Sequence, residues 1–359
     1  QWKSSLGLDA KFAYGFIGTV EMIYGKDINP VYARNVNLVD PQPLNVTGYP
    51  DNRMIYPASR YINAPTTDAP IVMDNAKKGG DYFSTSFQLA KPFGNHWDMS
   101  VAYTYSHAKN YGDQAGDQIF NLWSIPPTNT GNPNSPSLSY TSNIVPHSVV
   151  GGLTYKNEWI KGLKTGMTLF YQGSSQGRFS YIYSSDFNRD NQNNDLIYVP
   201  KDRSEISFAS LTVGGVTYNE EQQKDILFAF IEKDKYLSSR KGKYAERNGA
   251  VAPWRHQFDF RFSQELYAGK IGERRHGLEL YFDIFNVGNL INSKWGTYTL
   301  NNNNFLTPTN TSSLTAGGAT RPLFRLNTIN NAPMAEPQRI NTSISSTYYM
   351  QFGLRYSFN

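Results

Sequence analysis

Residues 348–359 read YYMQFGLRYSFN, and every second position of this stretch carries a large apolar side chain. A period of two is typical of a β-strand, in which successive side chains point to opposite faces. The apolar face would hold Tyr348, Met350, Phe352, Leu354, Tyr356 and Phe358, and the other face would hold Tyr349, Gln351, Gly353, Arg355 and Ser357. The stretch therefore predicts a strand with one apolar and one polar face.

The same alternation returns along the whole chain. It is found at residues 6–12, 16–24, 83–90, 97–105, 149–155, 163–171, 256–263 and 278–284. Each segment approaches the about 9–11 residues that a tilted strand needs to cross a bilayer. Charged residues such as Asp259, Arg261 and Asp283 occupy the second face of two of these strands, which argues against a dry core on that side.

The composition narrows the class of protein. The 359 residues include no Cys, which excludes a disulfide framework and Cys-ligated metal sites. No stretch approaches the about 18 consecutive apolar residues of a transmembrane helix, so a membrane role would depend on alternating strands. The net charge of +5 is spread without a basic tract, and we expect no nucleic-acid partner.

The connections between the expected strands are of two kinds. Short turns such as AYG (13–15) alternate with long polar connectors at residues 40–68, 112–136, 184–253 and 301–341. Outer-membrane barrels show this asymmetry, with short periplasmic turns and long extracellular loops. A soluble β-sandwich or β-propeller also has alternating strands. We favour an antiparallel transmembrane β-barrel, because turn asymmetry, aromatic strand ends and an aromatic terminal strand coincide.

The number of expected strands indicates whether they can close a barrel by themselves. About nine strands are expected here, whereas a barrel with both chain ends in the periplasm needs an even number. An open sheet edge in lipid would leave unpaired backbone groups at several kcal/mol each. We therefore expect further strands upstream, in the same gene product or in another chain.

Three segments carry a family resemblance: DFNRDNQNNDLIYVP (186–200), ERNGAVAPWRHQFDFRFSQEL (246–266) and LYFDIFNVGNLINSKWG (280–296). Together they resemble the C-terminal barrel portion of TonB-dependent outer-membrane receptors, in particular the Oar-like group of Bacteroidetes. The resemblance covers nearly the whole of residues 1–359. It implies a barrel of about 22 strands or more around an N-terminal plug, with the plug, its TonB box and the first strands lying outside this sequence.

The resemblance also implies partners and a location. The chain would be a multi-pass barrel in the outer membrane of a Gram-negative bacterium, in contact with its lipid and lipopolysaccharide, and coupled to TonB through the missing plug. A terminal strand ending in an aromatic resembles the signal read by the barrel-assembly machinery. The residues of that signal would be Phe352, Leu354, Tyr356 and Phe358.

One motif has the chemistry of a metal site. Oxygen-bearing side chains stand at nearly alternate positions of the DFNRDNQNND segment, at Asp186, Asn188, Asp190, Gln192 and Asp195. A curled loop could direct several of them at one hard cation such as calcium. The loop is not an EF-hand, because Asn191 and Ile197 replace the expected Gly and Glu. A polar Asx-turn loop without a metal is the alternative.

The connector at residues 184–253 is expected to contain a helix. Asn219 and Gln222 form a candidate capping box, and Ile226, Leu227, Phe230 and Ile231 fall on one helical face of residues 220–235. Packing on the barrel rim is the simplest role for this helix, and a lid or a contact for a surface lipoprotein is the alternative. The basic residues that follow, Arg240, Lys241, Lys243 and Arg247, could meet lipopolysaccharide phosphates or form a solvated face.

The FNVGNLINSKWG segment (285–296) is expected to be structural, with a substrate contact at the barrel rim as the alternative. Asn286, Gly288 and Asn289 favour a bend or bulge where a strand leaves the membrane, and Trp295 suits an interfacial position.

The five His residues have no Ser or Asp partner that the sequence places nearby, and no HExxH or phosphate-loop motif occurs, so we do not expect an enzyme.

Three functions are compatible with these patterns. The first is TonB-dependent uptake of a large or scarce solute, with the loops at residues 184–253 and 301–341 taking part in capture. The second is a structural barrel that scaffolds surface lipoproteins in an outer-membrane complex. The third is a passive porin. The polar, aromatic loops would suit peptides, glycans and metal chelates alike, so the sequence does not define a substrate.

Overall fold

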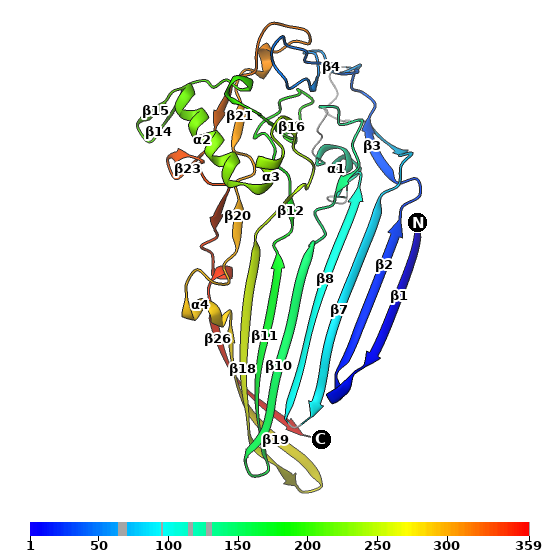
Figure 1. The fold of residues 1–359 in the computed structure, drawn as a ribbon, viewed down its shortest axis with the longest axis vertical. Coiled ribbons are helices and arrows are strands. Elements are labelled where there is room, and N and C mark those ends of the chain that lie inside the picture. The colour runs from blue at the N-terminus through cyan, green and yellow to red at the C-terminus, as the bar shows by residue number, and fades with distance from the viewer. Residues whose placement is uncertain (64–69, 95, 114–117, 127–130, 359) are drawn as a thin grey trace.

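A computed structural model describes all residues except 64–69, 95, 114–117, 127–130 and 359. Parts of the first two expected connectors lie outside the described residues. The main feature is one antiparallel sheet whose strands follow one another along the chain (Figure 1). In order across the sheet these are β1 (Trp2–Lys11), β2 (Ile17–Lys26), β7 (Asp81–Gly94), β8 (Trp97–Asn110), β10 (His147–Ile160), β11 (Leu163–Ser175), β18 (Trp254–Ile271), β19 (Arg274–Phe285) and β26 (Tyr349–Phe358). The all-β prediction and its strand positions are thus confirmed.

The two faces of the sheet differ as the alternation predicts. On one face, Phe282 of β19 stacks on Phe352 of β26 with ring centroids 4.4 Å apart. On the other, Arg261 of β18 makes a two-pronged ion pair with Asp283 of β19, at 2.5 and 2.7 Å. We call these the apolar face and the polar face. Side chains of either kind are aligned by the cross-strand register, since directly opposite residues share a face.

The two ends of the sheet also differ. At one end, which we call the turn end, strands are joined by short connections such as the 3-10 turn at Ala13–Gly15. Two of these hairpins are longer than expected. β10 continues to Ile160, beyond the expected segment at residues 149–155. β18 and β19 keep pairing as far as Ile271 and Arg274, beyond the expected segments at residues 256–263 and 278–284, so His276 lies in β19.

The sheet is open within the described residues. β1 pairs only with β2, and β26 pairs only with β19, so each has one edge without a strand partner in this part of the chain. Among the described residues, none of the helices combines the length and the apolar composition required to pass through a membrane.

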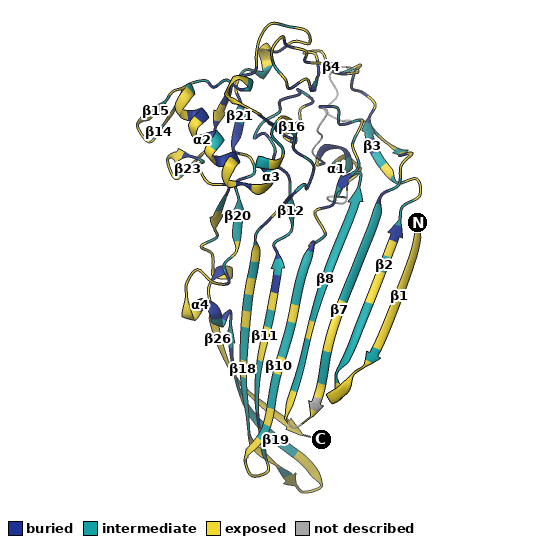
Figure 2. Ribbon diagram, in the orientation of Figure 1, coloured by how far each residue is buried: buried dark blue, intermediate teal, exposed yellow. Residues whose placement is uncertain are grey.

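At the opposite end, the loop end, the long connections fold into a unit that we call the cap: the described parts of residues 27–80, 111–146, 176–253 and 286–348 (Figure 1). Its core includes Leu44, Phe187, Phe230, Phe305 and Phe324, which come from three different connections. A smaller cluster joins Ala33, Leu38 and Tyr56 to Trp123 of the second connection. Figure 2 shows that buried residues gather in the cap, whereas the strands of the sheet are mostly intermediate or exposed.

The cap contains short paired strands and helices. Its strands are β3 (Val31–Asn35) with β6 (Ile71–Asn75), β4 (Gln42–Pro43) with β5 (Met54–Ile55), β12 (Arg178–Phe179) with β17 (Ala250–Val251), β13 (Tyr198–Val199) with β16 (Lys243–Tyr244), β14 (Leu211–Val213) with β15 (Val216–Tyr218), β20 (Thr299–Asn301) with β25 (Gln338–Ile340), β21 (Leu306–Pro308) with β22 (Phe324–Leu326), β23 (Thr328–Ile329) with β24 (Ala332–Pro333), and β9 (Ser139–Tyr140) with the end of β8. Its α-helices are α1 (Ile119–Ser124), α2 (Glu220–Lys233), α3 (Lys235–Ser239) and α4 (Val287–Ile291), and further 3-10 turns lie at Arg203–Glu205, Thr311–Ser313 and Ile344–Ser346.

Helix α2 agrees with its prediction. The Asn219 side chain accepts a hydrogen bond from the Gln222 backbone N–H, and the Gln222 side chain accepts one from the Asn219 N–H. Leu227, Phe230 and Ile231 are fully buried in the core of the cap. The connector at residues 301–341 differs from the expected plain loop, since its short strands pair and contribute Phe305 and Phe324 to that core.

Candidate functional site

The centre of the cap holds a buried cation, Arg53. Its Nε donates to both carboxylate oxygens of Asp51 at 3.1 and 3.0 Å, and its Nη2 donates to the Leu196 carbonyl at 2.9 Å. Its Nη1 lies 3.6 Å from Asp195 Oδ1, and all three charged side chains are fully buried. Because a buried charge is costly without a partner, this group ties the first long connection to the third.

Aromatic rings enclose the same guanidinium. Its central carbon lies 4.4 Å from the ring centroid of Phe187, 4.9 Å from that of Tyr183 and 5.5 Å from that of Tyr244. The Tyr244 hydroxyl donates to Asp51 Oδ1 at 2.8 Å. Cation–π contact with a desolvated Arg adds to the ion pairs.

The predicted acidic motif wraps beside Arg53 as a closed loop. Asp186 accepts hydrogen bonds from the backbone N–H groups of Arg189 and Asn191, at 2.6 and 2.8 Å. Asp195 Oδ2 accepts from the N–H groups of Phe187 and Asn188, at 2.9 and 3.1 Å. Both carboxylates therefore accept backbone N–H groups of the same loop, and the Asx turns that the alternative interpretation predicted are made by Asn188 and Asp190.

All five predicted ligand residues lie in this loop, and the side chains of four of them accept backbone N–H groups within it. Asn188, Asp190 and Asp195 are buried. Asn188 Oδ1 accepts from the Asp190 N–H at 3.0 Å, and Asp190 Oδ1 accepts from the Gln192 N–H at 2.7 Å. Gln192 takes part through that backbone N–H, and it is only partly buried. Across the residues that the structure describes, no group of three or more His, Asp or Glu side chains is arranged to hold a metal ion. Calcium binding therefore stays a prediction.

The loop has a surplus of negative charge. Burial raises the pKa of Asp195 to about 6, although Arg53 and two backbone N–H groups act in the opposite direction. Burial, together with the charge of Asp195, raises the pKa of Asp190 well above its usual value. Burial by itself would lower the pKa of Arg53. Nearby negative charges, that of Asp51 first, outweigh burial and raise the pKa overall. Arg53 is therefore shared by Asp51 and Asp195, and Asp190 is a further buried carboxylate under the charge of Asp195.

Sequence analysis did not find Arg53 or Asp51. They stand in the polar segment YPDNRMIYP (49–57), which has no periodicity or motif. The contact from Arg53 to the Leu196 carbonyl spans 143 residues of sequence, so no local pattern reports it.

The basic residues after α2 do not form the single solvated face that was considered. Arg247 is 2% exposed, and its Nη2 donates to the Asn110 and Ser139 carbonyl oxygens. Arg240 donates to the Tyr244 carbonyl at 2.6 Å, and Lys241 pairs with Glu232. The expectation that Arg247 meets lipopolysaccharide is therefore wrong, since its charge is used inside the cap.

Aromatic rings mark two levels on the apolar face of the sheet. At the turn end, Trp97 of β8 lies against Tyr155 of β10, with ring centroids 4.8 Å apart. At the loop end, Tyr105 of β8 lies against His147 of β10, at 5.2 Å. On each strand the two rings are eight residues apart, which corresponds to about 26 Å of extended chain.

On the apolar face, the residues of β8 and β10 between these two levels are all apolar or glycine, apart from Tyr103. They are Met99, Val101 and Tyr103 on β8, and Val149, Gly151 and Leu153 on β10. The Tyr103 hydroxyl shares a hydrogen bond with His147 Nδ1 at 2.8 Å, and on the next strands the Tyr171 hydroxyl shares one with His256 Nδ1 at the same distance. The loop-end row of rings thus continues from β8 to β18.

Two further predictions concern residues of the sheet. Phe352, Leu354, Tyr356 and Phe358, the expected assembly signal, lie together on the apolar face of β26 and are all exposed; their recognition stays a prediction. The sequence placed no Ser or Asp near any of the five His residues, and the structure brings one such pair together, with His107 Nε2 3.5 Å from Asp81 Oδ2. The sequence did not reveal this pair because it depends on the register of β7 and β8.

The fold and the cap define an all-β protein with a large antiparallel sheet and a folded cap at one end. Neither the models of known protein families nor the curated proteins nor the solved structures compared with the chain give a match.

Proposed function

We propose that this chain forms part of the wall and of the extracellular face of an outer-membrane β-barrel that takes up a large or scarce solute with energy from TonB. One observation carries the membrane part of the proposal: the paired rings Trp97–Tyr155 and Tyr105–His147, eight residues apart on both strands, with apolar residues between them. Outer-membrane barrels have an apolar band about 25 Å tall between two aromatic girdles.

The cap supports the extracellular part of the proposal. All four long connections leave the same end of the sheet, and all the short turns lie at the other end. A folded cap over the mouth of a barrel would present binding surfaces that are held in place by the buried Arg53 cluster. The polar face, with its Arg261–Asp283 pair, would face the barrel interior.

Uptake can be tested without knowing the solute. Culture medium is analysed by mass spectrometry after growth of the wild type, of a strain lacking this gene and of wild-type cells treated with a protonophore. We expect at least one solute to be depleted only by untreated wild-type cells, because TonB transmits the energy of the inner-membrane proton gradient. Depletion that persists with the protonophore would favour a passive porin instead.

A structural role is the second candidate, and the compact core of the cap favours it. Residues of three connections close this core, as expected of a rigid docking platform. The intact mass of the polypeptide from the outer membrane, with its co-purifying partners, separates the two candidates. A mass far above 40.6 kDa would fit a receptor with upstream plug and strands, whereas a mass near 40.6 kDa with a stable lipoprotein partner would fit the scaffold.

A further inference from the structure

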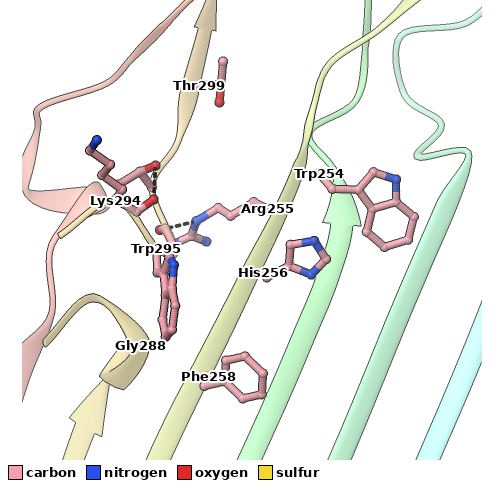
Figure 3. Close-up of a pocket in the computed structure, with 10 residues that line it drawn as sticks. Trp254, Arg255, His256, Phe258, Gly288, Lys294, Trp295 and Thr299 are labelled. Atoms are coloured by element: carbon pink, nitrogen blue, oxygen red, sulfur yellow. Dashed lines mark hydrogen bonds between the residues drawn. The ribbon is translucent and has the colours of Figure 1, made fainter. Parts of the chain in front are cut away.

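A notch opens in the sheet where β19 stops pairing with β18. The last registered pair at the loop end is Phe260 with Ile284. Beyond it, Asn286 adopts a left-handed conformation, with φ 54° and ψ 48°, and turns the chain into α4. The start of β18 therefore has no neighbouring strand on that side among the described residues, and a cavity of about 410 Å³ lies there (Figure 3).

Aromatic side chains line this notch. Trp254, His256 and Phe258 follow one another along β18, and Trp295 lies opposite, in the segment after α4 (Figure 3). Gly288 closes the space between them, since a Cβ added there would lie 3.7 Å from the Trp295 ring and 4.0 Å from Phe258. The volume falls within the range of about 300–1,000 Å³ that is usual for small-molecule sites.

The charged side chains at the notch are basic. Lys294 and Arg255 line it together with His256, and no acidic residue does so. Arg255 is held in place, because its Nε donates to the Gly296 carbonyl at 2.9 Å and its guanidinium lies 3.9 Å from the centroid of the Tyr298 ring. Lys294 is exposed and forms no ion pair within the described parts of the chain. An anionic group would find complementary charge here.

The notch opens toward the apolar face at the level of the loop-end rings. Trp254 stacks on His256, which shares the hydrogen bond with Tyr171, so the lining continues the aromatic row of β8, β10 and β11. Trp295 in the lining has 55% of its surface exposed, and Ile291 at the end of α4 has 75% exposed. Such exposed apolar and aromatic residues, with basic groups next to them, are typical of a membrane–water interface.

We propose that this notch binds a phosphorylated glycolipid of the outer leaflet. Its phosphate would lie against Lys294, with Arg255 adding positive charge from the other side of β18. Its sugar and the first part of its acyl chain would lie against Trp254, His256, Phe258 and Trp295. The inference rests on the proposed outer-membrane location and goes beyond it by assigning a lipid site to named residues. A dissolved solute would approach from the polar face or the cap, whereas Trp254, His256 and Phe258 belong to the apolar face that would meet lipid. Arg255 alternates with them along β18 and lines the notch from the other side of the strand.

The test uses the full-length protein, extracted from the outer membrane in mild detergent and examined by native mass spectrometry. The variant Lys294→Gln with Trp295→Ala is compared with the control Lys161→Gln with Trp159→Ala at the turn end. The control is matched, because Trp159 is 56% exposed and Trp295 55% exposed, and both Lys residues are exposed. Lys294→Gln alone is a milder variant that leaves the fold of the loop intact.

We expect the wild type and the control to retain a phosphorylated glycolipid, and the notch variants to lose it. For Lys294→Gln alone, apparent affinity should fall about fivefold, the equivalent of about 1 kcal/mol for one basic side chain at an anionic lipid surface. Equal retention by all variants would overturn the site. Retention of a phospholipid in place of the glycolipid by the wild type would overturn the assigned lipid.

The two proposals can fail separately. A chain that is absent from the outer-membrane fraction would refute the proposed location, and the lipid site with it. A chain that is present there, has the expected barrel migration on unheated gels, and carries no glycolipid would refute only the lipid site.

Discussion

At the scale of the residue, we expect Arg53 to make a large contribution to the stability of the cap. We expect Arg53→Met to destabilise the cap by about 3–5 kcal/mol, because it leaves Asp51 and Asp195 buried without their cation. Hydrogen exchange of the α2 amides measures this, since α2 packs in the same core. The control is Arg34→Met, whose ion pair with Asp74 has side chains 40% and 45% exposed and should contribute at most about 1 kcal/mol. Similar effects of both variants would mean that the buried cluster is not the tie between the connections.

The buried carboxylates predict how cap stability depends on pH. Burial raises the pKa of Asp195 to about 6 and that of Asp190 well above its usual value, so the folded cap holds these protons more tightly than the unfolded chain. In the presence of chelator, the free energy of unfolding should therefore fall as pH rises from about 4 through 6. Asp190→Asn should flatten this slope and stabilise the cap at pH 7.

The matched control is Asp225→Asn on the outer side of α2, where the carboxylate is 64% exposed. It should leave the pH dependence of the wild type unchanged. A free energy of unfolding that rises between pH 4 and 6 in the wild type would contradict the burial argument. Such a rise is expected when folding lowers the pKa values of carboxyl groups, not when it raises them.

At the scale of the element, the acidic loop at residues 186–195 makes a separate prediction. Its surplus of buried negative charge would be neutralised by a divalent cation, so removal of calcium should loosen residues 184–200 and speed their cleavage by added protease. Cleavage sites are read by mass spectrometry with and without chelator, and the turn at residues 161–162 serves as an internal reference. Equal rates at residues 184–200 under both conditions would leave the loop as an Asx-turn structure without a metal.

The elements differ in how far the sequence reveals them. The strands and helix α2 could be predicted because their signals are local: alternation with a period of two in the strands, and the Asn219–Gln222 capping box in α2. The core of the cap could not, since Leu44, Phe187 and Phe305 meet only after three connections have folded. The notch beside β18 was predicted in part, as a bend near Asn286 with Trp295 at an interface, but its cavity depends on where β19 ends.

At the scale of the whole molecule, the open question is what surrounds the apolar face. In water, so many exposed aromatic and aliphatic residues would form an unusually large apolar surface, whereas lipid would accept them. The edges of β1 and β26 give a second reason to expect further strands, because unpaired backbone groups are not tolerated in a bilayer.

An arginine scan along β8 distinguishes lipid from water. Val101 lies midway between Trp97 and Tyr105 on the apolar face, so Val101→Arg should destabilise the barrel by about 2–4 kcal/mol if that face lies in a bilayer. Tyr105→Arg, at the level of the loop-end rings, should cost only about 0–1 kcal/mol for burial of the charge, in addition to the loss of its ring contacts. Tyr105→Ala measures those ring contacts alone, so the difference between the two Tyr105 variants isolates the charge. Folding free energies are measured by reversible denaturation in phospholipid vesicles. A cost of Arg that does not depend on depth would indicate a soluble β-protein, because water solvates the charge equally at both positions.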